Sequence, residues 1–134
     1  MSDIDAVLFA NEVFYRAFAD CDVAAMDGLW AVAAPVCCIH PGWEAIYRRE
    51  DVMASWRAIL TGNAPPDIRC IAHRVHYYGD AAFVVCYEAI GDEYLIATNF
   101  FIREEGRWKM AHHQAGPTRA VIEDETDDSA PSIN

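Results

Sequence analysis

Apolar residues in the first third of the chain recur with the spacing of amphipathic helices. The first stripe repeats every three to four positions and consists of Ile4, Val7, Leu8, Asn11, Phe14, Tyr15 and Phe18. Ser2, with an acidic residue three positions later, is typical of a helix N-cap. We therefore predict a helix from about Asp3 to Asp20. Shorter stripes predict a second helix after Asp22, which is a suitable N-cap, and a third over about residues 50–60.

The period changes from about 3.6 to 2 in the second half of the chain. Four segments there are rich in β-branched and aromatic residues: 68–78, 81–91, 94–104 and 107–115. They are separated by Gly79-Asp80, Gly91-Asp92 and Glu105-Gly106, which are typical of hairpin turns. An earlier apolar run, residues 36–39, predicts one more buried strand that ends at Pro41-Gly42. The fold class is therefore α+β, with helices packed on one face of a curved antiparallel sheet.

Composition places most of the chain in one folded domain. Hydrophobic residues make up 54% of the 134 positions, which is far above the content of a disordered chain. We predict a domain over residues 1–120 and an acidic, flexible tail over residues 121–134, where five carboxylates lie between positions 123 and 128. The formal net charge of −11 argues against nucleic acid or an anionic membrane as a partner.

Cysteine usage favours a reducing compartment. The five cysteines are odd in number and lack a CxxC spacing, and the N-terminus lacks the pattern of a signal peptide. We therefore expect a cytoplasmic protein with free thiols. We expect none of these thiols to be activated.

The tetrapeptide His40-Pro41-Gly42-Trp43 carries the strongest local signal for chemistry. It places a titratable ring and a large aromatic side chain where a buried strand ends. With an unperturbed pKa of about 6.5, a histidine there can accept a proton near neutral pH. The same pattern also suits a hydrogen-bonded core histidine, and the motif alone leaves both interpretations open.

Further motifs resemble one protein family over about residues 3–117. They are Phe14-Tyr15-Arg16-Ala17-Phe18, Met26, Leu29-Trp30, the His40 tetrapeptide, Val52-Met53-Ala54-Ser55-Trp56, Gly106-Arg107-Trp108 and His112-His113-Gln114. Together they are similar to SnoaL-like proteins of the nuclear transport factor 2-like superfamily, which includes ketosteroid isomerase. The resemblance implies a cone-shaped α+β barrel with an internal pocket, commonly a homodimer through the outer face of the sheet.

The resemblance also assigns roles to particular positions. In ketosteroid isomerase a carboxylate base precedes a proline, and the matching residue here is His40. The oxyanion hole of that enzyme uses a tyrosine and a neutral aspartic acid, which align with Phe14 and Asn99. Phe14 cannot donate a hydrogen bond whereas Asn99 can, so at most half of that oxyanion hole survives. Tyr15 is one residue away from the aligned tyrosine and would replace it only with a different register.

The site implied by the resemblance has His40 as general base or acid, Asn99 as donor and His113 as a second titratable group. Its ligand-binding residues are Trp43, Phe14, Tyr15, Trp30, Trp56 and His112. His112 and His113 should point to opposite faces of the last strand unless a bulge intervenes, and the sequence does not decide which of them faces the pocket.

Two functions remain open at this stage. In the first, the chain binds a small hydrophobic, carbonyl-bearing molecule and catalyses a proton transfer like that of an isomerase, dehydratase or cyclase. In the second, it is a non-catalytic accessory or oligomerisation module similar to a kinase association domain. We predict no cofactor, and no metal site because the sequence contains neither HxH nor HExxH.

Three other polar positions receive structural interpretations. Glu88 lies among apolar residues, and we expect an ion pair with Arg74 or an exposed outer face rather than a general acid. His73 and His76 have opposite parity on their strand, and we expect both to be ordinary surface or interface residues.

Overall fold

The computed structural model describes residues 1–62, 67–120 and 122. The predicted acidic tail over residues 121–134 lies outside the described residues apart from position 122, so its boundary stays a prediction.

Three helices form where the apolar stripes predicted them. Helix α1 (Asp3–Ala19) begins at Ser2, whose Oγ accepts a hydrogen bond from the backbone N–H of Asp5 at 3.1 Å. Helix α2 (Val23–Leu29) begins after Asp22, whose carboxylate accepts from the N–H of Ala25 at 3.0 Å. Helix α3 is Arg49–Leu60. The side chains of Ser2 and Asp22 thus satisfy backbone donors that the first turns of α1 and α2 leave unpaired.

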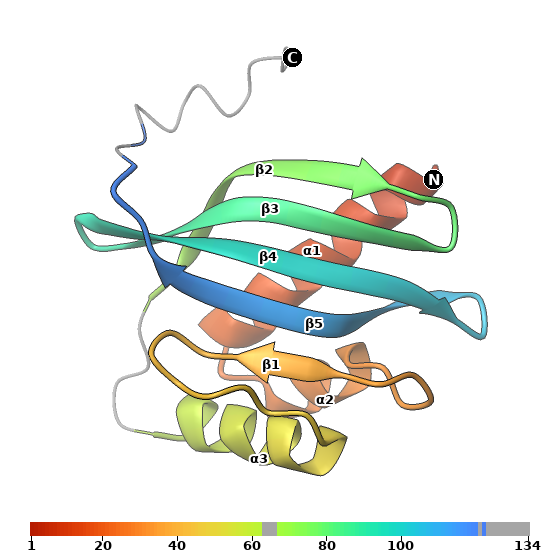
Figure 1. The fold of residues 1–134 in the computed structure, drawn as a ribbon, viewed down its shortest axis with the longest axis horizontal. Helices are drawn as coiled ribbons and strands as arrows, with labels where there is room; N and C mark the ends of the chain where they lie inside the picture. The colour runs from red at the N-terminus through yellow and green to blue at the C-terminus, as the bar shows by residue number, and fades with distance from the viewer. Residues whose placement is uncertain (63–66, 121, 123–134) are drawn as a thin grey trace.

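Five strands form one sheet in the order β1-β5-β4-β3-β2. The strands are β1 (Cys37–Ile39), β2 (Arg69–Tyr77), β3 (Ala81–Ile90), β4 (Glu93–Glu104) and β5 (Arg107–Pro117). Strand β1 pairs with β5 in parallel, and the other neighbours are antiparallel. Helix α1 crosses one face of the sheet, and α2 and α3 lie near its β1 edge (Figure 1). The α+β prediction is confirmed.

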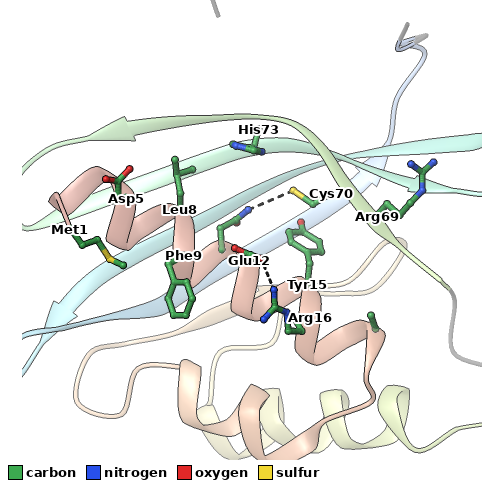
Figure 2. Close-up of a pocket in the computed structure, with 12 residues that line it drawn as sticks. Met1, Asp5, Leu8, Phe9, Glu12, Tyr15, Arg16, Arg69, Cys70 and His73 are labelled. Carbon is green, nitrogen blue, oxygen red and sulfur yellow. Dashed lines mark hydrogen bonds and ion pairs between the residues drawn. The ribbon is translucent and has the colours of Figure 1, made fainter. Parts of the chain in front are cut away.

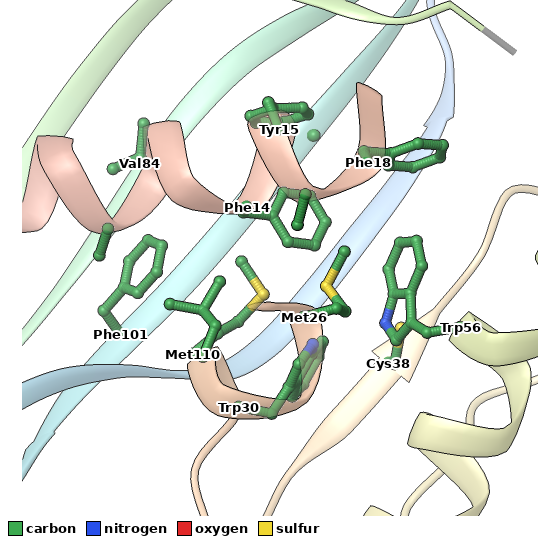
Figure 3. Packing of buried hydrophobic residues seen from close by; sticks show 14 of the residues in the cluster. Phe14, Tyr15, Phe18, Met26, Trp30, Cys38, Trp56, Val84, Phe101 and Met110 are labelled. Atoms are coloured by element: carbon green, nitrogen blue, oxygen red, sulfur yellow. The ribbon is translucent and has the colours of Figure 1, made fainter. Parts of the chain in front are cut away.

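Aromatic and sulfur-containing side chains fill the space between the helices and the sheet (Figure 3). Phe14 of α1 meets Trp56 of α3 edge to face with ring centroids 5.4 Å apart, and Phe18 meets the same indole at 5.3 Å. Trp30, Trp56 and Phe14 are completely buried. Burial of such side chains stabilises the fold by about 2–3 kcal/mol each, so these residues first of all form the core.

Arg49 fixes the chain between α2 and β1. Its Nε donates to the carbonyl of Ala31 at 2.9 Å, and its Nη2 donates to the carbonyl of Asp27 at 2.6 Å. Nη1 also pairs with the carboxylate of Asp27 at 3.1 Å. One guanidinium therefore satisfies several acceptors near the end of α2.

Two irregularities in strand pairing change which side chains face the helices. In β2, Cys70 pairs with Glu88 but Val75 pairs with Val84, with a register shift between Ile71 and Arg74. Ala72 has a positive φ of 54° there. The inward positions of β2 therefore change from even to odd numbers across this bulge.

A second bulge lies in β5. Met110 pairs with Phe101 while His112 pairs with Phe100, which leaves Ala111 as an extra residue on β5. Met110 and His113 are both buried, whereas strict alternation would place them on opposite faces. The bulge thus answers the question left open by the sequence, because it turns His113 inward and His112 outward.

Candidate functional site

Five polar side chains form a connected cluster beneath α1. His113 Nδ1 donates to Asn99 Oδ1 at 2.5 Å, and Asn99 Nδ2 donates to Asn11 Oδ1 at 2.8 Å and to the Tyr15 hydroxyl at 3.1 Å. The Tyr15 hydroxyl in turn donates to Glu88 Oε2 at 2.6 Å. All five residues are buried. We call this cluster the buried polar network: Asn11, Tyr15, Glu88, Asn99 and His113.

Local structure explains why these residues meet. Asn11 and Tyr15 are four positions apart in α1, so they lie one above the other on the same face of the helix. Asn99 and His113 are direct partners across β4 and β5. Glu88 lies on the inward face of β3, which alternates with the half-buried outer face. The network therefore joins α1 to three strands of the sheet.

The surroundings shift the titration of the two ionisable ends of the network. Burial raises the pKa of Glu88 to about 7, although the hydrogen bond from Tyr15 lowers it. Burial lowers the pKa of His113 to about 3. At neutral pH, His113 is therefore neutral, while Glu88 is present in both its ionised and its protonated form.

His40 lies outside this network. Its Nε2 is 2.9 Å from Ser55 Oγ, and that hydroxyl donates to the carbonyl of Val52 at 2.7 Å. His40 Nε2 is therefore the donor in the first bond, because the single hydroxyl proton is already used. Burial lowers the pKa of His40 to about 4. The ring of Trp56 packs against both histidines, with centroids 4.7 Å from that of His40 and 5.9 Å from that of His113.

A pocket of about 700 Å³ opens between α1 and the edge strand β2 (Figure 2). One wall is a stripe of α1 that includes Leu8, Asn11 and Tyr15, and the other includes Cys70 and His73 of β2. The remaining lining residues are Met1, Asp5, Phe9, Glu12, Arg16, Ala19 and Arg69. Asn11 and Tyr15 belong to both the pocket wall and the buried polar network, so the network has one end at the pocket.

The structure separates the predicted site residues into several groups. Asn99 and His113 come together, and Tyr15 joins them at the pocket wall, whereas His40 bonds to Ser55. Trp43 is 49% exposed and packs against the His40 ring at 4.7 Å. His112 Nδ1 lies 3.0 Å from the carbonyl of Cys37. Phe14, Trp30 and Trp56 lie in the core.

The register of α1 also differs from the one inferred from the resemblance. Tyr15, and not Phe14, brings its side chain to Asn99. The Tyr15 hydroxyl and the Asn99 amide lie side by side, as the alternative register requires. The expectation that at most half of the oxyanion hole survives stays a prediction.

Glu88 is the residue that sequence reasoning misplaced most clearly. The expected ion pair with Arg74 or exposed outer face is wrong, because Glu88 is 2% exposed and bonds to Tyr15. The sequence signal for its burial was a carboxylate that lies among apolar residues of the strand. Asn11 had a similar signal, as the one amide within the apolar stripe of α1.

His73 and Cys70 gave weaker signals. His73 is exposed, as expected for a surface residue, but it also lines the pocket. Its position beside Cys70 depends on the bulge at Ala72, which the sequence does not mark.

The described residues provide neither a metal-binding cluster nor a membrane-spanning helix. No group of three or more histidine, cysteine, aspartate or glutamate side chains in that part of the chain could hold a metal ion. No helix within residues 1–62 and 67–120 combines the length and apolar character needed to cross a bilayer.

Comparison with known proteins identifies the family. A family model described as a SnoaL-like domain matches residues 7–119. A proposed dehydratase of the NTF2-like family from Streptomyces avermitilis is 29% identical, with a TM-score of 0.81 over 88% of this chain and 97% of that one. The motif resemblance is thereby confirmed. The comparison with curated proteins gave no match.

Other solved structures with the same fold carry different descriptions. A proposed calcium/calmodulin-dependent protein kinase type II association domain from Thiobacillus denitrificans is 28% identical, with a TM-score of 0.70 over 82% of this chain and 93% of that one. A proposed ketosteroid isomerase from Parabacteroides distasonis is 16% identical, with a TM-score of 0.65 over 81% of this chain and 84% of that one, and shows the fold alone.

Proposed function

The chain belongs to the SnoaL-like domain family, and we propose that it binds a small, largely apolar carbonyl compound between α1 and β2 and catalyses a proton transfer there. The observation that carries this proposal is the position of the Tyr15 hydroxyl. Tyr15 lines the pocket, and its hydroxyl donates to the buried carboxylate of Glu88 at 2.6 Å. A hydrogen-bond donor at the pocket wall is thus in direct contact with a proton acceptor buried behind it.

Tyr15 and Asn99 supply the polar recognition in this proposal. A carbonyl oxygen entering the network can accept from the Tyr15 hydroxyl and from the Asn99 amide, which are 3.1 Å apart. Donors held in a buried site stabilise the negative charge that develops on such an oxygen when a neighbouring carbon loses a proton.

Glu88 is the proposed proton acceptor. Its pKa of about 7 suits a group that takes up a proton and returns it near neutral pH. The hydrogen bond from Tyr15 lowers this pKa. When Tyr15 turns its hydroxyl to a ligand, Glu88 therefore becomes a stronger base at the moment when the carbonyl is polarised. His113 stays neutral and holds Asn99 through its Nδ1–H.

The relatives are consistent with this chemistry without defining it. The Streptomyces avermitilis protein, proposed to be a dehydratase, aligns over almost the whole of its own length. Removal of a proton next to a carbonyl is a step that dehydratases and isomerases share. The prediction that His40 is the central base stays a prediction, and the experiment below tests it beside Glu88.

The test is exchange of the α-protons of 2-tetralone for deuterium in D₂O, followed by proton NMR. We expect the wild-type protein to accelerate exchange over buffer, and Tyr15→Phe and Glu88→Gln each to lose at least about 10-fold, as for removal of a general base or an oxyanion donor. Tyr47→Phe is the matched control, because Tyr47 is 71% exposed. No acceleration by the wild-type protein would contradict the proposal. Loss in His40→Ala with retention in Glu88→Gln would assign the base to His40.

A second candidate function is assembly, and the outer face of the sheet favours it. No described helix covers that face (Figure 1). It carries the half-buried apolar side chains Phe83, Val85, Tyr87, Ile96 and Phe100. An apolar sheet face is suited to a second copy of the chain, and the similar Thiobacillus denitrificans structure is a proposed association domain.

We propose a homodimer through this face. Light scattering should give the mass of a dimer for the wild-type protein and of a monomer for Tyr87→Glu, which places a charge in the face. A monomeric wild-type protein would contradict the dimer. A ring of many subunits together with no tetralone exchange would favour assembly over catalysis.

A further inference from the structure

A half-buried thiol lies in the β2 wall of the pocket. Cys70 lines the cavity, and Asn11 Nδ2 of the opposite wall donates to its Sγ at 3.6 Å (Figure 2). Asn11 also receives a hydrogen bond from Asn99 through its Oδ1, which fixes the direction in which its amide protons point. The sulfur of Cys70 is therefore held at the pocket wall by an oriented donor.

The bulge at Ala72 brings a histidine to the same wall. Without an extra residue, positions 70 and 73 of a strand face opposite sides. The register shift between Ile71 and Arg74 places both Cys70 and His73 on the pocket. Bulges commonly redirect side chains beside functional sites. His73 also interacts directly with the Cys70 thiol.

Cys70 and Cys86 form a pair in which the two thiols differ in exposure. Cys86 of β3 is completely buried, whereas Cys70 reaches the pocket. Hydrogen bonds from Cys86, His73 and Asn11 lower the pKa of Cys70 to about 6, against the opposing effect of burial. The pKa of Cys86 is raised by the same contact with Cys70 and by its own burial. The negative charge therefore belongs on the sulfur that faces the cavity.

Other titratable groups face Cys70 from the neighbouring elements. Tyr15 of α1 and Glu88 of β3 are close enough for charge on Cys70 to raise the pKa of each. Glu88 in its ionised form opposes a thiolate at Cys70. Because the pKa of Glu88 is about 7, the two groups compete for a single negative charge as the pH rises through neutrality.

We propose that Cys70 is a nucleophilic thiol that forms covalent adducts with α,β-unsaturated carbonyl compounds that enter the pocket. The sulfur forms a bond to the β-carbon, the carbon–carbon π bond breaks, and its electron pair moves to the carbonyl oxygen as an enolate. The thiol proton, passed through His73, is then delivered to the α-carbon. The addition is complete without an oxidant or a leaving group.

The pocket suits this class of electrophile. Apolar side chains of α1, including Leu8 and Phe9, cover one side of it, and the Tyr15 hydroxyl provides a donor for a carbonyl oxygen. The inference goes beyond the proton transfer proposed above and does not require it, because thiol addition needs neither Glu88 as a base nor exchange at the α-carbon.

The test uses N-ethylmaleimide, a conjugated carbonyl compound, with N-ethylsuccinimide as the saturated control. Intact-mass and peptide-mapping measurements at pH 6 compare Cys70 with Cys21, an exposed thiol in the same chain. Relative to an ordinary thiol of pKa about 8.5, a thiol of pKa about 6 has about 150-fold more thiolate at pH 6. A thiolate of lower pKa is also less nucleophilic, which reduces this advantage by a factor of about 13. We therefore expect Cys70 to react about 10-fold faster than Cys21.

The same rule predicts that the order reverses at pH 9, because an ordinary thiol of pKa about 8.5 is largely ionised there and its thiolate is about 13-fold more nucleophilic than one of pKa about 6. Equal or faster labelling of Cys21 at pH 6 would overturn the proposal. So would a Cys70–Cys86 disulfide in the protein purified without reductant, because the nucleophile would then be consumed by its neighbour.

A pair of histidine variants tests the role of the bulge. His73→Gln should slow the labelling of Cys70 at pH 6 several-fold and leave Cys21 unchanged. His76→Gln is the matched control, because His76 is an exposed residue of the same strand that stacks on Phe83 at 4.5 Å. Equal labelling of Cys70 in both variants would remove His73 from the proposal.

A carboxylate variant separates this proposal from the proposed function. Glu88→Gln should lose tetralone exchange but keep the preferential maleimide labelling of Cys70, because thiol addition does not use Glu88 as a base. Loss of the adduct preference in a protein that still catalyses exchange would overturn only the thiol site.

Discussion

Glu88→Gln should make the protein more stable at pH 8, because it removes a carboxylate that is costly to ionise in the folded state. The folded protein holds the pKa of Glu88 at about 7, against an ordinary value of 4.5. The folded state therefore binds this proton more tightly than the unfolded state. Its contribution to stability is complete below pH 4.5 and is lost as the pH rises to about 7.

The size of the effect follows from the pKa shift. Raising the pKa of Glu88 from 4.5 to about 7 corresponds to about 3 kcal/mol between the fully protonated and fully ionised limits. Between pH 5 and pH 8, the wild-type protein should lose about 2–3 kcal/mol of unfolding free energy through Glu88 alone. Glutamine keeps an oxygen that accepts from Tyr15 but carries no charge, so the variant should not show this loss.

The assay is urea unfolding of both proteins at several values between pH 5 and pH 8. The difference in unfolding free energy between the variant and the wild-type protein separates the effect of Glu88 from those of His40 and His113, which both proteins share. Burial lowers the pKa of both histidines, so their contributions change on the acid side and are lost as the pH falls. Glu93→Gln, at an exposed position at the start of β4, is the control and should show a constant difference. A pH-independent difference for Glu88→Gln would refute the reasoning.

Two further substitutions test how the network and the loop before β1 are held. Asn99→Ala leaves the Nδ1–H of His113 and the Oδ1 of Asn11 without the partner seen in the structure. It should therefore lower the unfolding free energy, measured in urea, by about 2–4 kcal/mol. Thr98→Ala, on the outer face, is the control and should lower it by less. Arg49→Lys cannot reproduce the forked contacts to Ala31 and Asp27, and should cost about 1–3 kcal/mol measured by thermal unfolding, against little change for the exposed Arg48→Lys.

The elements of the fold could be predicted from the sequence because their signals are local. Helical spacing around Phe14 and Phe18 and the cap at Ser2 gave α1 to within one residue. The glycine-containing turns at 79–80, 91–92 and 105–106 gave the β-meander. These features depend on neighbouring residues and on burial of one face, which a single sequence records.

The site was harder to predict because it depends on register across distant elements. Strict alternation along β5 would place His112 on the same face as Met110, and the extra residue Ala111 places His113 there instead. Similarly, Tyr15 reaches Asn99 although the aligned position in α1 was Phe14. No local pattern marks a bulge at an alanine, so the sequence could name the correct residue types without their contacts.

The buried polar network also has a consequence for how the chain folds. Its hydrogen bonds connect positions as far apart as Asn11 and Asn99, and Tyr15 and Glu88. A one-residue slip of β3 or β4 against its neighbours would turn Glu88 or Asn99 away from these partners and bury apolar surface in the wrong layer. Compact intermediates with slipped strands would therefore be less stable than the native arrangement. Docking of α1 would favour the one strand pairing in which every residue of the network has its hydrogen-bond partners.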